Sequence, residues 1–347
     1  MYKNSLNHIQ DAITQAHTGD KQQLDAIFSD AKRLIVEAPA GYGKTKTMIS
    51  KIAYILASGK LPNPKRILAL TFSVNAAYKI KKDVSGQLPK LLESGHFNPA
   101  NLNERLFISN YHGFCRHVLR FYGYLIHENL KNIETIKSID DSNIETLTNL
   151  GVGLVYDDAK ELSDLCDAIK DVREEYINDN VGSYLQKVRS HLLPNNYITY
   201  NSIILLILHL FDDYPELLEF YQKYFPIVIV DEFQDTNIIS YAILRRLISD
   251  QTKVIFIGDP LQRIYGFIGA IPNLMERAKE EFGMQEIRLK ENHRFKDNPK
   301  MILLDRNIRL NAEDPSAPSI DDNAVVDLEI FEDQQEEAEW VQEKIQS

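Results

Sequence analysis

Residues 227 to 237 read IVIVDEFQDTN, an apolar run that ends in two adjacent carboxylates, Asp231 and Glu232. The residues before Asp231 are β-branched, and such a run suits a strand that is buried on both faces of a parallel sheet. Open α/β sheets bind their ligands at the carboxyl ends of their strands. We therefore expect Asp231 to hold Mg²⁺ and Glu232 to activate a water at this edge.

A second stretch, APAGYGKT at residues 38 to 45, shows the same order of strand and loop. Residues 34 to 36 form the expected strand, Gly41 and Gly43 let the backbone curl around phosphate, and a helix should begin near Lys44. The helix N-terminus, the Lys44 ammonium and the Thr45 hydroxyl suit the phosphates and the Mg²⁺ of ATP. The predicted nucleotide-binding residues are Ala38, Pro39, Ala40, Gly41, Tyr42, Gly43, Lys44 and Thr45, with Thr45 and Asp231 as Mg²⁺ ligands and Ala38 in place of the usual first glycine.

The length of 347 residues, 44% of them hydrophobic, allows two domains or one large one. The longest apolar run, residues 203 to 208, is too short to span a bilayer, and the N-terminus lacks a basic-then-apolar leader. We expect a cytoplasmic chain without membrane contact. Cys115 and Cys166 fit neither a disulfide framework nor a zinc site, so both are interpreted as buried thiols.

The net charge of −11 is unevenly distributed along the chain. Residues 121 to 224 carry −10 and residues 311 to 347 carry −11, so the motif-bearing remainder carries +10. Lys79, Lys81 and Lys82 follow a predicted strand, where they could neutralise backbone phosphates of a nucleic acid or simply form a solvated helix face.

Six strands are expected, at residues 34–36, 67–70, 106–109, 227–230, 254–257 and 287–289, and helical stretches separate them. This alternation predicts an α/β fold with a mostly parallel sheet that helices cover on both faces. Residues 121–224 lack such strands and are acidic and helical in pattern, as in residues 159–176, so we expect an inserted helical subdomain. Its acidic pairs, at 140–141, 157–158 and 212–213, are interpreted as solvated helix ends or loops.

Residues 257 to 270 read IGDPLQRIYGFIGA and add a further motif. Together the motifs cover most of residues 5 to 300, and they resemble, in the same order, those of UvrD/Rep/PcrA-type superfamily 1 DNA helicases. The resemblance implies a RecA-like P-loop NTPase whose first core domain comprises residues 1–120 and 225–310, with the helical subdomain at 121–224 and the start of a truncated second RecA-like domain at 311–347. It also implies that Gln10, in LNHIQDAI, recognises adenine; taken alone, Gln10 is equally a helix-surface residue.

The stretches at residues 67–82, 108–120 and 257–270 resemble the family's contacts with single-stranded DNA. The side chains implied to bind DNA are Thr71, Phe72, Asn75, Tyr111, His112, Tyr265 and Phe267. Tyr265 and Phe267 lie two residues apart and could stack on bases, a contact worth about 1–3 kcal/mol per base. Phe267 stands where tryptophan is usual and Ile268 where arginine is usual, and Phe72 could instead fill the core.

The remaining implied roles concern the phosphates and the base. Gln262 would sense the γ-phosphate and the attacking water. KENHRFKDNP at residues 290–299 resembles the family's NYRS-like motif, so Arg294 would contact the γ-phosphate like an arginine finger, and His293 would replace a tyrosine that stacks on adenine. The catalytic residues expected are Lys44, Asp231, Glu232, Gln262 and Arg294.

Residues 311–347 resemble the opening strand and helix of the second RecA-like domain, with an apolar helix stripe of Ala338, Trp340, Val341 and Ile345. The later motifs of that domain do not appear in the sequence. We therefore expect the N-terminal part of an ATP-dependent helicase or translocase acting on single-stranded or partly duplex DNA, with the other motor domain in a longer product or a partner chain. The resemblance implies movement from 3′ to 5′. The alternative is a regulatory module that binds ATP and DNA without unwinding. A P-loop NTPase acting on protein partners would leave Phe72, Tyr265 and the basic residues without a purpose.

Overall fold

The structure is a computed structural model that describes residues 2–92, 102–313, 331 and 333–346. These residues form two compact units, Met1–His293 and Arg294–Ser347, and each is described by itself. The larger unit holds every predicted catalytic residue except Arg294. The domain boundaries given above stay predictions.

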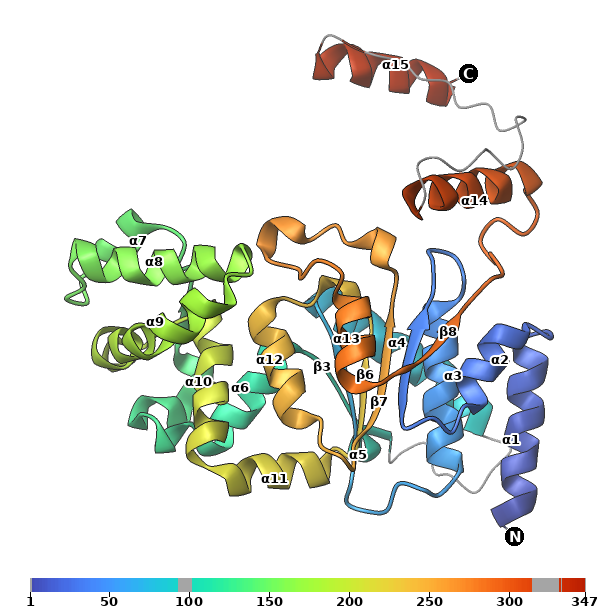
Figure 1. Cartoon of the computed structure of the whole chain (residues 1–347), viewed down its shortest axis with the longest axis horizontal. Coiled ribbons are helices and arrows are strands. Elements are labelled where there is room, and N and C mark those ends of the chain that lie inside the picture. Colours follow the sequence, from blue (N-terminus) through green and yellow to red (C-terminus); the bar gives the residue numbers. More distant parts are fainter. Residues whose placement is uncertain (1, 93–101, 314–330, 332, 347) are drawn as a thin grey trace. The chain divides into compact units, whose positions relative to one another are not determined.

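The larger unit is built on a six-stranded sheet with the order β3-β2-β6-β7-β1-β8 (Figure 1). All its neighbouring strands are parallel, which confirms the predicted α/β class. The predicted strands are confirmed to within two residues at either end. Their bounds are β1 Arg33–Glu37, β2 Ile67–Thr71, β3 Leu106–Asn110, β6 Ile227–Val230, β7 Lys253–Gly258 and β8 Gln285–Arg288.

Strands β1, β6 and β7 alternate their apolar side chains between two cores, one on each face of the sheet. Leu34 and Val36 pack in a cluster with helices α1 (Tyr2–Ala16), α2 (Lys21–Phe28), α3 (Lys44–Ala57) and α4 (Val74–Leu92). Ile35, Val228 and Val230 belong to the other cluster, which is covered by α6 (Tyr111–Tyr122), α10 (Tyr200–Asp213), α12 (Ile238–Leu247) and α13 (Leu274–Phe282). Burial on both faces explains why the strands read as continuous apolar runs.

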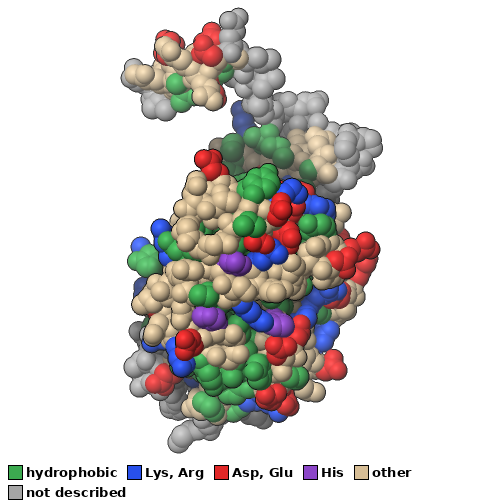
Figure 2. Space-filling view, turned by 90° about the vertical axis from the view of Figure 1, so that its left-hand side faces the viewer, with side chains coloured by type: hydrophobic (Ala, Val, Ile, Leu, Met, Phe, Trp, Pro, Cys, Tyr) green, Lys and Arg blue, Asp and Glu red, His purple; other side chains and the backbone are tan. Residues whose placement is uncertain are grey.

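The segment between β3 and β6 is helical, as predicted, apart from a short parallel pair, β4 (Lys137–Ile139) and β5 (Tyr197–Thr199). It contains α7 (Ile144–Thr148), α8 (Tyr156–Lys170), α9 (Glu174–Lys187) and α11 (Pro215–Tyr224). Figure 2 shows the larger unit from the side of α8 and α9. The helical pattern at residues 159–176 is not one helix. The chain turns at Val172, which has a positive φ of 57°, so that α8 and α9 pack against each other.

The prediction that residues 140–141 are solvated is wrong for Asp141, which is 2% exposed. Its carboxylate accepts hydrogen bonds from the Tyr184 hydroxyl and the Asn201 amide, and burial raises its pKa. Cys115 and Cys166 are free and buried, as predicted. None of the described helices is long and apolar enough to cross a membrane.

The smaller unit contains α14 (Pro299–Glu313) and α15 (Gln334–Gln346). On α15, the Trp340 ring lies 5.6 Å from that of Phe331, and Val341 is exposed. The strand expected before this helix falls on residues outside the described ranges.

Candidate nucleotide site and nucleic-acid interface

The loop between β1 and α3 has the shape of a phosphate cradle. Gly41 and Gly43 both have φ of +85°, which residues with a side chain rarely adopt, and α3 begins directly afterwards at Lys44, as predicted. The unpaired N–H groups at the start of this helix favour an anion. Ala38 is buried and its N–H donates to the Gly258 carbonyl. Since Ala38 is not among the described residues with positive φ, an alanine fits where the usual motif has glycine.

Three predicted catalytic residues, Lys44, Glu232 and Gln262, meet at the Lys44 ammonium. Its Nζ donates to Glu232 Oε2 and to Gln262 Oε1, each at 2.9 Å. Glu232 follows β6 and has a positive φ of 49°, and its Oε2 also accepts from the Gln234 amide. The carboxyl ends of β1, β6 and β7 thus converge on one ammonium group, as the parallel sheet requires.

Asp231 has the properties of a cation ligand. It is 5% exposed, and its Oδ1 is buried without a hydrogen-bond partner in the described part of the chain. Burial and the neighbouring Glu232 raise its pKa to about 7. Divalent cations such as Mg²⁺ are bound by carboxylate oxygens, so this orphaned oxygen fits the predicted metal. Thr45 stands at the start of α3, and its ligand role stays a prediction.

A glutamine that was not predicted contacts the phosphate loop. The Gln23 amide donates to the Tyr42 carbonyl at 2.9 Å, and a Cβ on Gly43 would lie 2.4 Å from Gln23 Nε2. Gln10 lies on α1, where its carbonyl accepts from Thr14 Oγ1, and its adenine role stays a prediction. The sequence signal for Gln23 was its place in the helix next to β1, after the helix-capping Asp20.

Gln23 is held by a buried network. His17 Nδ1 donates to Gln23 Oε1, and Ser50 Oγ donates to His17 Nε2 at 2.8 Å. Burial lowers the pKa of His17, which favours this neutral tautomer. The ring atom His293 Nε2 lies 2.9 Å from Gln23 Nε2 and 2.8 Å from Asp20 Oδ2. The backbone N–H of His293 donates to the Gly41 carbonyl. His293 is therefore next to the phosphate loop, in keeping with its predicted place at the nucleotide.

Three aromatic rings form a row beside this site. The Phe72 ring lies 4.9 Å from the Tyr265 ring, which lies 6.1 Å from the Phe267 ring. Phe267 is 74% exposed, and Asn75 at the start of α4 is also exposed. A cavity of about 450 Å³, lined by Thr71, Phe72, Tyr265, Glu232 and Gln262 among others, joins the row to the catalytic residues. The structure thus brings together most of the predicted DNA-binding residues.

Tyr111 and His112 are in different surroundings. Tyr111 is 1% exposed and its hydroxyl pairs with Thr236 Oγ1 at 3.1 Å, so its ring belongs to the core. His112 lies against the Tyr200 ring, its Nε2 is buried without a described partner, and burial lowers its pKa. Contact of these two side chains with DNA stays a prediction, and the burial of Tyr111 argues against it. Arg294 begins the smaller unit, so its γ-phosphate role also stays a prediction.

Comparisons with known proteins identify a family that the chain resembles. The sequence model of the UvrD/REP helicase N-terminal domain matches residues 19–283. Proteins named ATP-dependent DNA helicase PcrA, from Staphylococcus aureus and Bacillus subtilis, are 28% identical over 288 residues, covering 79% and 78% of this chain and 37% of each relative. A probable DNA helicase II homolog of Mycoplasma capricolum is 30% identical over 265 residues, covering 72% of this chain and 35% of the relative. The chain thus spans little more than a third of the length of these relatives.

Proposed function

Since the chain belongs to the UvrD/REP helicase family, we propose that it is the ATP-binding N-terminal part of a DNA helicase or translocase that moves 3′ to 5′ along single-stranded DNA. The observation that carries this proposal is the Lys44 ammonium between Glu232 and Gln262, next to the orphaned oxygen of Asp231. The second motor domain would come from a longer product or a partner chain. The names and lengths of the PcrA relatives support both statements.

Each catalytic side chain has a role that follows from its position. When ATP enters, its phosphates offer Lys44 a stronger partner than Glu232, which leaves the Glu232 carboxylate able to accept a proton from water. Gln262, from the loop after β7, orients that water. Asp231 and Thr45 would hold Mg²⁺, which neutralises charge on the phosphates when it is bound. Arg294 would complete the charge stabilisation.

For the base, we place Gln23 ahead of Gln10. A glutamine amide can pair with both N6 and N7 of adenine, and the Gln23 amide is already oriented by His17 and anchored to the Tyr42 carbonyl. His293 lies beside it and offers a ring for the base. Measuring KM for ATP and GTP in Gln23→Glu and Gln10→Glu variants tests this choice. We expect only the Gln23 variant to lose its preference for ATP, and a loss in the Gln10 variant alone would reverse the choice.

The ATPase rate of the 347-residue chain, with and without single-stranded DNA, tests the proposed function. Lys44→Ala is the control, because it removes the ammonium that would hold the phosphates. Stimulation by DNA that disappears in Lys44→Ala supports the helicase proposal. The absence of both ATP binding and DNA binding contradicts it.

The alternative is the regulatory module that binds ATP and DNA without unwinding. Measurable binding of both ligands with negligible turnover would select it. Binding to nucleic acid that does not weaken as salt is raised would instead favour an NTPase with protein partners, because contacts with phosphates release counterions.

A further inference from the structure

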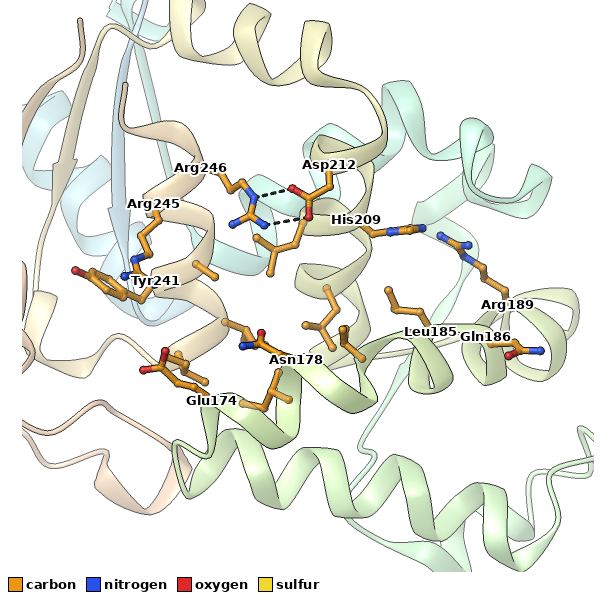
Figure 3. A pocket seen from close by; sticks show the side chains of 18 of the residues that line it. Glu174, Asn178, Leu185, Gln186, Arg189, His209, Asp212, Tyr241, Arg245 and Arg246 are labelled. Carbon is orange, nitrogen blue, oxygen red and sulfur yellow. Dashed lines mark hydrogen bonds and ion pairs between the residues drawn. The ribbon is translucent and has the colours of Figure 1, made fainter. Parts of the chain in front are cut away.

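A second cavity, of about 540 Å³, lies between α9 and α10 of the helical segment and α12 of the core (Figure 3). None of the residues predicted to bind nucleotide, metal or DNA lines it. It is therefore separate from the site proposed above.

One wall of this groove is a continuous stripe along α9. Ile177, Val181 and Leu185 follow one another at a spacing of four, so they lie on one face of the helix. Glu174 lies at one end of the stripe, and Arg189, in the helical turn η4 (Val188–Leu192), lies at the other. At 1.5 Å per residue the stripe is about 22 Å long. The groove is thus as long as a helix of about four turns.

The floor and the opposite wall are also helical and carry apolar side chains beside the charged ones. Leu205 and Leu208 come from α10, and Ile238 and Ile239 come from α12. A groove with three helical walls and apolar side chains at three- and four-residue spacing suits the apolar face of another helix. A compact small molecule would contact only part of it.

The charged side chains at the groove are paired, except one. Arg246 makes a bidentate contact with Asp212, at 2.8 and 3.0 Å (Figure 3). Outside the groove lining, Glu281 accepts from Arg245 at 2.5 Å. Arg189 has no acceptor among the described residues, and its Nε is buried without a hydrogen bond. A buried guanidinium N–H without an acceptor is costly, so an acceptor supplied from outside would stabilise it.

We propose that this groove docks an acidic amphipathic helix of a partner protein. The apolar face of that helix covers Val181 and Leu208, which are only partly buried in this chain. A carboxylate of the helix pairs with Arg189. The length of the groove selects a helix, and the unpaired guanidinium selects an acidic one.

Fluorescence anisotropy with two labelled model peptides and the full chain tests the proposal. Each peptide is a helix of about sixteen residues with leucines at three- and four-residue spacing; the other positions are mainly glutamate in one peptide and lysine in the other. We expect the glutamate peptide to bind at least tenfold more tightly at an ionic strength of about 0.15 M. Nucleotide is left out, so the result does not depend on the proposed ATPase.

Three variants locate the binding. Val181→Asp places a charge in the apolar stripe and should abolish binding. Arg189→Gln should weaken binding of the glutamate peptide about tenfold. Arg173→Gln is the matched control, because Arg173 is exposed at the start of α9 and does not line the groove, and it should bind as the wild type does. Thermal melting confirms that each variant is folded.

Several results would overturn the proposal. Failure of the glutamate peptide to bind, equal binding of the two peptides, or unchanged binding by folded Val181→Asp or Arg189→Gln would each do so. The aromatic anion anilinonaphthalene sulfonate tests for a small ligand. If it binds to the wild type but not to Val181→Asp, and the glutamate peptide does not displace it, the groove is assigned to a small ligand instead.

Discussion

Phe267→Ala removes the most exposed ring of the aromatic row. Phe267 is 74% exposed and belongs to neither core cluster, so the substitution should leave the free energy of unfolding nearly unchanged. If its ring stacks on a base, as the row with Tyr265 suggests, the variant loses about 1–3 kcal/mol of binding free energy, or about 5- to 150-fold in Kd. ATP binding should not change.

The assay is anisotropy of a labelled oligothymidylate, with urea unfolding measured on the same samples. Phe121→Ala is the matched control, because this phenylalanine is 54% exposed on α6 and lies outside the proposed DNA site. The stacking argument is refuted by equal affinities of Phe267→Ala and the wild type. An equal loss in Phe121→Ala would refute the assigned location.

Three further outcomes are expected. Glu232→Gln should keep ATP binding and lower single-turnover hydrolysis about 10²- to 10⁴-fold, and a normal rate would remove Glu232 from the role of base. Lys51 is 2% exposed, and burial lowers its pKa from 10.5 in the unfolded chain to about 7. Between pH 7 and pH 10.5 the unfolded chain therefore binds more protons than the folded chain. The free energy of unfolding should rise with pH in this range, by at most about 1.4 kcal/mol per pH unit. Urea unfolding at about pH 7.5 and 9.5 should show this rise in the control variant Lys21→Met, which changes an exposed lysine, but not in Lys51→Met. A rise that persists in Lys51→Met would contradict the assignment of the pH dependence to Lys51. Tyr184→Phe withdraws the hydroxyl bonded to buried Asp141 and should destabilise the chain by about 1–3 kcal/mol in urea unfolding, whereas wild-type stability would show that this bond contributes little.

The parts of the fold that could be predicted depend on local pattern. A strand buried on both faces must be apolar at every position, so the run ending at Val230 was recognisable without knowledge of its neighbours. Gly41 and Gly43 indicated a loop that needs left-handed backbone, and β1 and α3 flank this loop as expected. Asp231 and Glu232 were found for the same reason, since strand ends position ligands in this class of sheet.

What escaped prediction depends on contacts between distant segments. Asp141 looked solvated because its neighbours are polar, and the residues that bury it, Tyr184 and Asn201, come much later in the chain. Gln10 and Gln23 both stand in N-terminal helices, and only the packing of α2 on α3 places Gln23 against the phosphate loop. The network around Gln23 also needs His293, from the far end of the larger unit.

The position of β1 in the sheet has a consequence for synthesis on the ribosome. This strand leaves the ribosome early, but its neighbours are β7 and β8, with Leu34 pairing with Ile255 and Gln285. Both edges of β1 therefore stay unpaired until most of the larger unit has been translated, and such late, long-range pairing is slow. Nascent chains halted before residue 254 would expose an apolar strand with two free edges, which is the kind of segment that chaperones and proteases act on.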